Sequence, residues 1–137
     1  MSPSMNPRSW HELSMNPEAV TQIYRVPPSL SRVQLTEVEL HRDGPRMSLH
    51  AILSEFPDNP PRRWLRDGCN VAAIQLDFFA VSDVALAGWS TDNVTDLEIT
   101  EAPGGRLAIS ARFTGGALSA TCESFRIAHF SAHIAGS

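Results

Sequence analysis

The sequence predicts a mostly β protein, an antiparallel β meander of about seven strands with a short N-terminal helix packed on it. Between residues 33 and 134 apolar residues largely alternate with other residues, which is the period of a half-buried strand. Turn sequences such as Asp43-Gly44 and Pro103-Gly104-Gly105 join these segments at hairpin length. Such short connections favour antiparallel pairing, because parallel strands need long crossovers. The pattern leaves open whether the strands form one curved sheet or a two-sheet sandwich.

Length and composition indicate one folded unit. The chain has 137 residues, the size of a single domain. About a quarter of them are Leu, Ile, Val or Phe, more than disordered chains contain. No apolar run approaches the roughly 18 to 20 residues of a membrane span, and the N-terminal region lacks the apolar stretch of a signal peptide. We expect a cytoplasmic domain over residues 10–137 and a flexible tail over residues 1–9.

Residues 10–24 are predicted to be helical. Asn16 is a good N-cap, and Pro17 suits the first helical position, where a missing N–H costs nothing. Apolar residues then recur at helical spacing as Ala19, Val20, Ile23 and Tyr24. The pair Pro27-Pro28 ends this helix.

The remaining elements follow from alternation and turns. Residues 33–41 and 46–53 form a predicted hairpin, with a bulge where the apolar phase shifts between Leu35 and Val38. Residues 60–67 hold one helical turn closed by Gly68. The other strands are predicted over residues 71–80, 81–88, 94–100, 107–113 and 117–134.

The distribution of charge indicates which classes of partner are favoured. All eleven basic residues are arginine, and the formal net charge is −4. Six carboxylates and no basic residue occur between residues 77 and 101, namely Asp77, Asp83, Asp92, Asp96, Glu98 and Glu101. A nucleic-acid partner is disfavoured, because that binding requires neutralising phosphates. A basic protein partner is allowed, since opposite potentials steer association.

Motifs for catalysis or metal binding are weak. Cys69 and Cys122 are expected to be buried, reduced thiols, because neither has a ligand or disulfide context. His129 and His133 have zinc-ligand spacing, but no third ligand is nearby and no Glu makes an HExxH motif. The Gly-Gly pairs lie between strands and are turns. We predict no catalytic, cofactor-binding or metal site.

Two tryptophans and their surroundings favour structural roles. Trp64 lies among Arg62, Arg63 and Arg66, an arrangement we interpret as an apolar edge with arginines extending outward. Trp89 follows a strand end, and we favour a core position for it over an interface role.

Several of these residues together resemble a known family. The run Phe56-Pro57-Asp58-Asn59-Pro60-Pro61-Arg62-Arg63-Trp64 is followed by Gly68, Asn70 and then Gly88-Trp89. This combination resembles the Imm50 family, immunity proteins of bacterial polymorphic toxin systems, over about residues 10–134. The resemblance carries over no catalytic residues. Its matched positions are interpreted as structural, and they are Pro60, Pro61, Trp64, Gly68, Asn70, Gly88 and Trp89.

The resemblance implies a bacterial immunity protein that binds and neutralises a cognate toxin by occlusion, without catalysis. Toxins that cut nucleic acid tend to carry basic clefts, so a nuclease domain would suit an acidic partner. We expect the toxin-facing surface to include Asp83, Asp92, Asp96 and Glu98. No cofactor, nucleic acid or membrane is expected. The alternatives are a small-ligand-binding β module or an accessory interaction domain. The small-ligand module would have a pocket between helix and sheet, and its only support is two tryptophans near loops, Trp64 and Trp89.

Overall fold

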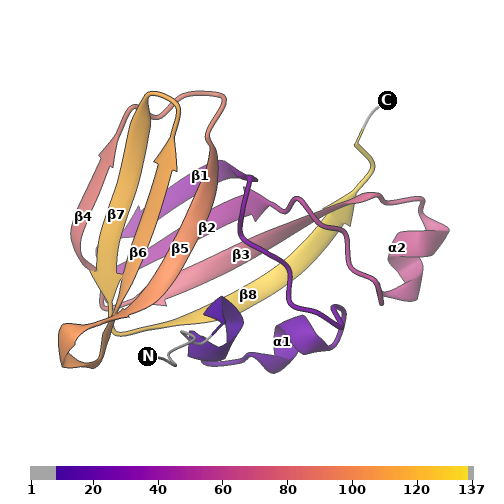
Figure 1. Cartoon of the computed structure of the whole chain (residues 1–137), viewed down its shortest axis with the longest axis horizontal. Coiled ribbons are helices and arrows are strands. Elements are labelled where there is room, and N and C mark those ends of the chain that lie inside the picture. The colour runs from indigo at the N-terminus through magenta and orange to yellow at the C-terminus, as the bar shows by residue number, and fades with distance from the viewer. Residues whose placement is uncertain (1–8, 136–137) are drawn as a thin grey trace, which may run out of the picture.

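The computed structural model describes residues 9–135. Eight strands make up most of it (Figure 1), and they are β1 (Val33–His41), β2 (Arg46–Ile52), β3 (Val71–Phe79), β4 (Ser82–Ala87), β5 (Val94–Ala102), β6 (Arg106–Phe113), β7 (Gly116–Cys122) and β8 (Ser124–His133). Within residues 9–135, helical structure is limited to the short turns η1 (Trp10–Leu13), α1 (Glu18–Thr21), α2 (Arg62–Arg66) and η2 (Pro103–Gly105). The predicted mostly β class is confirmed, and no described helix is long and apolar enough to cross a membrane.

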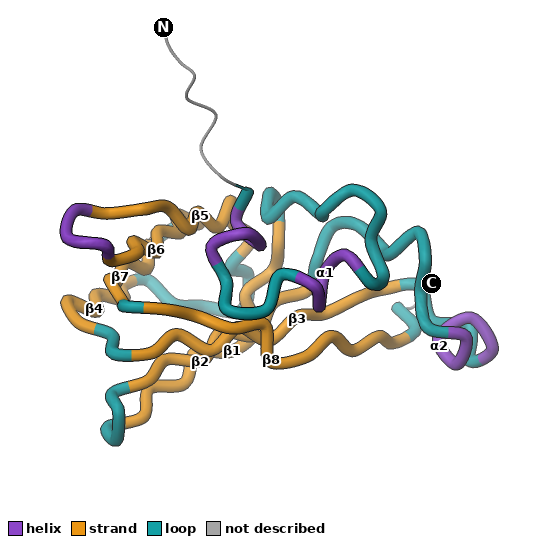
Figure 2. The backbone as a smooth tube through the Cα atoms, turned by 90° about the horizontal axis from the view of Figure 1, so that it is seen from below, coloured by secondary structure: helices purple, strands orange, loops and turns teal. Residues whose placement is uncertain are grey.

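The strands form one open antiparallel sheet in the order β4-β7-β6-β5-β1-β2-β3-β8. Two series of consecutive, paired strands build it, β1-β2-β3 and β5-β6-β7. These series meet at a short ladder in which β1 and β5 share only the pairs Val33–Thr95 and Gln34–Val94. The short ladder lets the sheet bend there into a front half (β4, β7, β6, β5) and a rear half (β1, β2, β3, β8), which cross in Figure 1. The tube in Figure 2 shows the same two layers from below.

The last predicted strand, over residues 117–134, needs correction. The segment 117–134 is two strands, because the chain leaves β7, passes Glu123 and enters the other half as β8. The backbone N–H of Glu123 donates to the Phe79 carbonyl at 3.0 Å, where β3 likewise gives way to β4. Consecutive strands β3 and β4 therefore belong to different halves and do not pair. A single straight strand cannot belong to both halves of the bent sheet. The segment 117–134 therefore divides into β7 and β8.

One hydrophobic core joins the two halves. Phe78 on β3 and Phe125 on β8 are fully buried and stack with ring centroids 5.4 Å apart. They belong to one buried cluster with front-half residues such as Ile109 and Leu118. Burying such side chains stabilises each by about 1.5–3 kcal/mol relative to exposure. The sheet is therefore held bent by a shared core.

The N-terminal segment differs from the predicted helix. Only residues 10–13 and 18–21 are helical, and Pro17, not Asn16, is at the N-cap of α1. The Asn16 side chain instead pairs with the Ile127 backbone, donating to its carbonyl and accepting from its N–H, both at 2.9 Å. The Met15 N–H donates to the Phe125 carbonyl at 2.8 Å. The segment thus covers part of the outer edge of β8, because those edge groups need partners.

Two local predictions are confirmed. The bulge in the first strand lies between Leu35 and Glu37. The helical turn after the proline-rich connection is α2, and Gly68 beyond its end has a φ of +76°, a conformation glycine adopts readily. The rear half contains a second bulge, between Gln75 and Leu76 in the ladder to β8.

Candidate functional site

The four carboxylates expected to face a toxin are all exposed but do not form one patch. Asp96 and Glu98 alternate along β5 and share its outer face. Asp92 lies in the loop before β5. Asp83 is on β4, at the other side of the front half, with β7 and β6 between. The structure therefore brings together Asp96 and Glu98 and leaves Asp83 apart from them.

Asp96 and Glu98 differ in their contacts. The Asp96 carboxylate accepts a hydrogen bond from the Arg32 N–H at 3.0 Å. Arg112 lies opposite Asp96 in the β5–β6 ladder, and both line a shallow hollow with Glu98 and Ser110. No hydrogen bond or ion pair joins the Glu98 carboxylate to any residue between 9 and 135. Glu98 is thus available to an external cation.

Asp77, the first carboxylate of the acidic stretch, has a structural role. Its side chain is only 5 % exposed and accepts hydrogen bonds from Ser48 at 2.8 Å, Gln75 at 3.0 Å and Arg126 at 3.3 Å. Burial raises its pKa, but these three hydrogen bonds outweigh burial and hold the pKa below its ordinary value. Asp77 therefore stays ionised inside the rear half and is not part of an accessible acidic surface.

A second polar cluster on the rear half has ligand-type side chains. Glu37, Glu39 and His50 place their ligand atoms within 4.8 Å of one another. The His50 Nε2 lies 3.6 Å from one oxygen of each glutamate, beyond hydrogen-bond distance. These three residues could hold a divalent cation, since imidazole and carboxylate are common ligands. Within the described residues this is the one such group, and His129 and His133 are not part of it.

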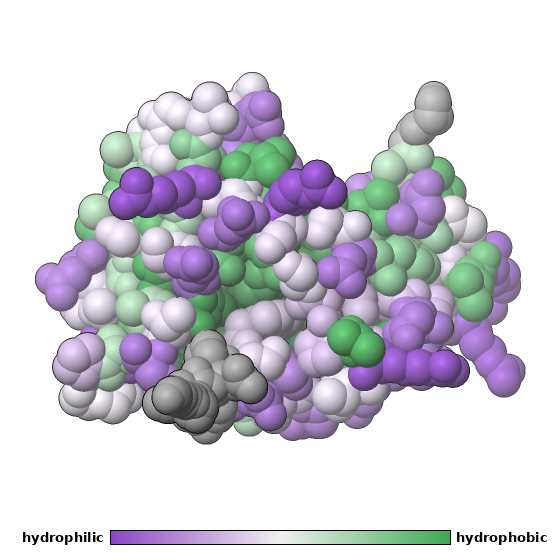
Figure 3. Space-filling view, in the orientation of Figure 1, coloured by the Kyte–Doolittle hydropathy of each residue, from purple (hydrophilic) through white to green (hydrophobic). Residues whose placement is uncertain are grey.

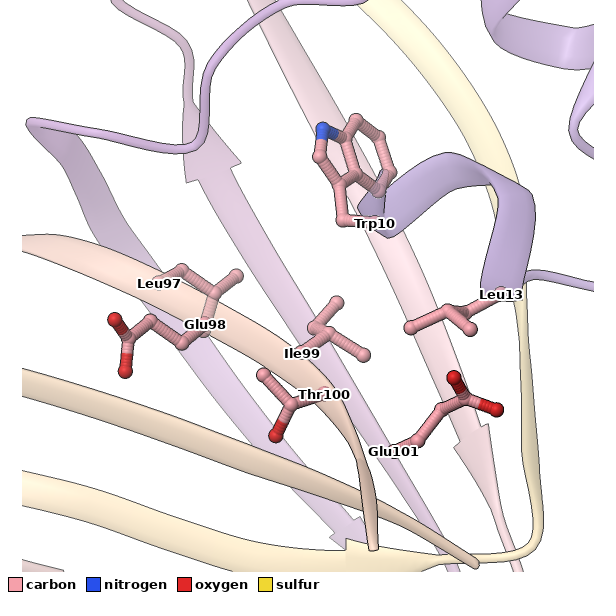
Figure 4. Close-up of a pocket in the computed structure, with 7 residues that line it drawn as sticks. All are labelled: Trp10, Leu13, Leu97, Glu98, Ile99, Thr100 and Glu101. Atoms are coloured by element: carbon pink, nitrogen blue, oxygen red, sulfur yellow. The ribbon is translucent and has the colours of Figure 1, made fainter. Parts of the chain in front are cut away.

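An apolar hollow lies between η1 and β5. It has a volume of about 350 Å³ and is lined by Trp10, Leu13, Leu97, Glu98, Ile99, Thr100 and Glu101. Leu97 and Ile99 point toward η1, while Glu98 points to the opposite face (Figure 4). The Trp10 indole N–H donates to the Pro28 carbonyl at 2.8 Å, which fixes that wall. We call this hollow the β5 groove, and it is the pocket between helix and sheet that the small-ligand alternative required.

The two tryptophans that supported the small-ligand alternative, Trp64 and Trp89, do not line the β5 groove. Trp64 is buried and packs on Phe56, with ring centroids 6.1 Å apart. Trp89 contacts Phe113 edge-on but remains 40 % exposed, so the core position favoured for it is wrong. It lies in the connection between β4 and β5, outside the strands that bury the core.

The motif positions contribute to backbone geometry. Pro61 is the N-cap of α2. The Asn70 side chain accepts a hydrogen bond from the Ala135 N–H at 2.8 Å. Gly88 has a φ of +73°, and a Cβ there would overlap the Gly115 backbone. Of the two thiols, Cys122 is buried as expected, whereas Cys69 is only half-buried.

Family comparison decides what this β domain is. Residues 16–133 match the family model described as Immunity protein 50, Imm50. The chain belongs to the Imm50 immunity protein family. This membership implies neutralisation of a cognate toxin, and immunity families are typically non-catalytic. Comparisons with curated proteins and with solved structures found no match.

The family match spans the sheet of this Imm50 chain but begins after η1. The motif residues, Asp96, Glu98 and the floor of the β5 groove lie within the match. Trp10 and Leu13, which form the other wall of the groove, lie outside it. Sequence reasoning missed these two residues, since their only signal was a local helical pattern.

Proposed function

We propose that this chain is a bacterial immunity protein that binds its cognate polymorphic toxin and neutralises it by occlusion, without catalysis. The observation that carries the proposal is the Imm50 match over residues 16–133. A toxin inhibitor of this kind requires a rigid scaffold and an exposed complementary surface, and the bent sheet with its single core suits that task. The bacterial cytoplasm is the compartment where such protection would act.

The charge distribution supports a basic toxin surface. The stretch from residue 77 to residue 101 contains no arginine or lysine, and five of its six carboxylates are exposed. Carboxylates so placed raise the association rate with a basic partner such as a nuclease domain. Asp96 and Glu98 are the strongest candidates, because they share one face of β5.

Co-expression tests this proposal. The C-terminal domain of the open reading frame directly upstream is expressed in a bacterial host, with and without this chain. We expect growth to collapse without the chain and to recover with it. The toxin domain separated from the purified complex should have an unchanged mass and regain activity. Failure to rescue, or a covalently altered toxin, would contradict immunity by occlusion.

Charge reversal tests the contact surface. Because the four carboxylates are not contiguous, D96R/E98R and D83R/D92R are compared separately, with D43R/D67R as a matched control of exposed carboxylates on other elements. We expect slower association and a flatter salt dependence for D96R/E98R, as electrostatic steering is lost. Association kinetics equal to those of the control would exclude this surface.

A further inference from the structure

The strand β5 has an open edge, meaning an edge with which no described strand pairs beyond Thr95, although Leu97 and Ile99 are themselves buried. On one side it pairs with β6 from Asp96 to Ala102, but on the other it meets β1 only through Val94 and Thr95. The Leu97 N–H still donates across this second side, to the Leu30 carbonyl at 2.9 Å. In an antiparallel ladder, Ile99 presents its N–H and C=O to the same side. No strand of residues 9–135 pairs with β5 beyond that point.

The outer edges of the sheet are less suited to accept a strand. Residues 15 and 16 cover part of the β8 edge through the hydrogen bonds to Phe125 and Ile127. The β4 edge is interrupted by a register shift between Ser82 and Ala85, and Asp83 within it has a φ of +55°. Coverage and bulges are devices by which proteins blunt sheet edges. Over residues 98–102, by contrast, β5 keeps a regular register with β6.

The β5 groove runs beside this open edge. Leu97 and Ile99 form its floor, and Trp10 and Leu13 form the facing wall (Figure 4). The space-filling view shows hydrophobic residues at the bottom of a hollow in this face, with hydrophilic residues around it (Figure 3). A strand added at about 4.8 Å from β5 would direct alternate side chains into such a groove.

The charges beside this edge indicate which residues an added strand would carry. Asp96 and Glu98 stand on the other face of β5, beside the same edge. Side chains of an added strand on that face would lie opposite or diagonal to these carboxylates, and opposite charges across strands stabilise pairing. Side chains on the groove face would contact leucine, isoleucine and tryptophan. A segment alternating between basic and apolar residues fits both faces.

We propose that the open edge of β5 binds an extended basic segment of the cognate toxin, which adds to the sheet as a strand and packs its apolar side chains into the β5 groove. This inference rests on the proposed immunity function and names the surface that would perform it. The Ile99 backbone supplies hydrogen bonds, the groove supplies apolar contact, and Glu98 supplies the charge.

Binding of the upstream toxin domain tests the proposal. L13K places a cation in the groove, and E98R reverses the exposed charge beside the edge. Their controls are L65K, the same change at a leucine that is 62 % exposed on α2, and E18R on α1. We expect each test variant to weaken affinity by about tenfold or more, as for central interface residues, and each control by less than about twofold. Thermal unfolding confirms folding, and E98R keeps the test valid if L13K does not fold.

Amide hydrogen exchange distinguishes strand addition from side-chain contact alone. We expect the Ile99 N–H to exchange rapidly in the free full-length chain and to be protected in the complex. Rescue by the wild-type chain with no change at Ile99 or in the two variants would overturn this inference and leave the immunity function intact. Absence of any binding by the wild-type chain would instead remove both.

Other occupants give different results. An Ile99 amide already protected in the dilute free chain would mean that the chain itself fills the edge. Protection that grows with protein concentration would mean a second copy. Displacement of the toxin by a small molecule bound in the groove, without protection of Ile99 by the toxin, would favour a small-ligand site. Each of these results would overturn the proposal.

Discussion

One carboxylate from each half of the sheet, Asp77 in the rear half and Glu98 in the front half, differs sharply in its surroundings. Asp77 accepts hydrogen bonds from Gln75 on its own strand and from Ser48 and Arg126 on the two neighbouring strands. In the front half, Glu98 is exposed and Arg112 nearby forms no ion pair with it among the described residues. The edges differ too, since residues 15 and 16 cover part of β8 while β5 diverges from β1.

This difference separates stability from recognition. Polar groups satisfied inside a fold specify that fold, because leaving them unpaired costs about 1–3 kcal/mol each. Exposed charges contribute little to stability and remain available to steer a partner. In the function proposed above, the rear half would serve as the scaffold and the front half would carry the surface that contacts the toxin.

The largest effect is expected from the core shared by the halves. F125A removes one ring of the fully buried Phe78–Phe125 stack and should reduce the free energy of unfolding by about 3–5 kcal/mol. The control L40A, at a leucine exposed on β1, should change it by less than about 0.5 kcal/mol.

Urea unfolding measures this loss of stability. Amide hydrogen exchange in F125A also tests whether the two halves are coupled. Because one cluster spans both, amide protection should fall by a similar factor in β6 and in β3. Protection retained in β6 but lost in β3 would show that the front half folds on its own, and the comparison would then concern two independent units.

A smaller effect is expected from the charges themselves. D77N keeps the shape but replaces an ionised acceptor with an amide whose N–H₂ group can oppose the Arg126 guanidinium. It should destabilise the fold by about 1–3 kcal/mol. E98Q should change the free energy of unfolding by less than about 0.5 kcal/mol while altering toxin association.

The pH dependence gives Asp77 a distinct signature. Its folded pKa lies below its unfolded pKa, so the carboxylate stabilises the fold above the ordinary carboxyl range, and this contribution is lost as pH falls through the folded pKa. Unfolding measured from about pH 6 down to about pH 3 should therefore be less pH-dependent in D77N than in the wild type. Equal slopes would mean that the Asp77 network does not favour the ionised form.

Local sequence patterns predicted most of the strands. They could not predict features that depend on pairing between residues far apart in the sequence. The hairpin at Asp43-Gly44 and the bulge near Leu35 were predictable, because turn chemistry and alternation act over a few residues. Asn16 was assigned to a helix cap, yet it pairs with Ile127, more than one hundred positions away. The division at Glu123 likewise depends on a bend between halves that no local pattern encodes.

The candidate site shows the same limit. Period-two alternation places Asp96 and Glu98 on one face, so their proximity was predictable from the strand alone. Composition could not show that Asp77 is buried, because its partner Ser48 comes from another strand. The β5 groove was unpredictable for a related reason, since it exists only where η1 lies against β5.

The smallest expected effect is a difference in reactivity between two thiols, Cys122 in the front half and Cys69 next to the rear half. Cys122 on β7 is fully buried, and burial raises its pKa to about 11, so very little reactive thiolate forms near pH 8. Cys69, which precedes β3, is half-buried. A thiol reagent should therefore modify Cys69 first and Cys122 only upon unfolding, as followed by intact mass with C69S as the control. Modification of Cys122 in C69S faster than global unfolding would show that the front half opens by itself, which would make its core as accessible as its edge.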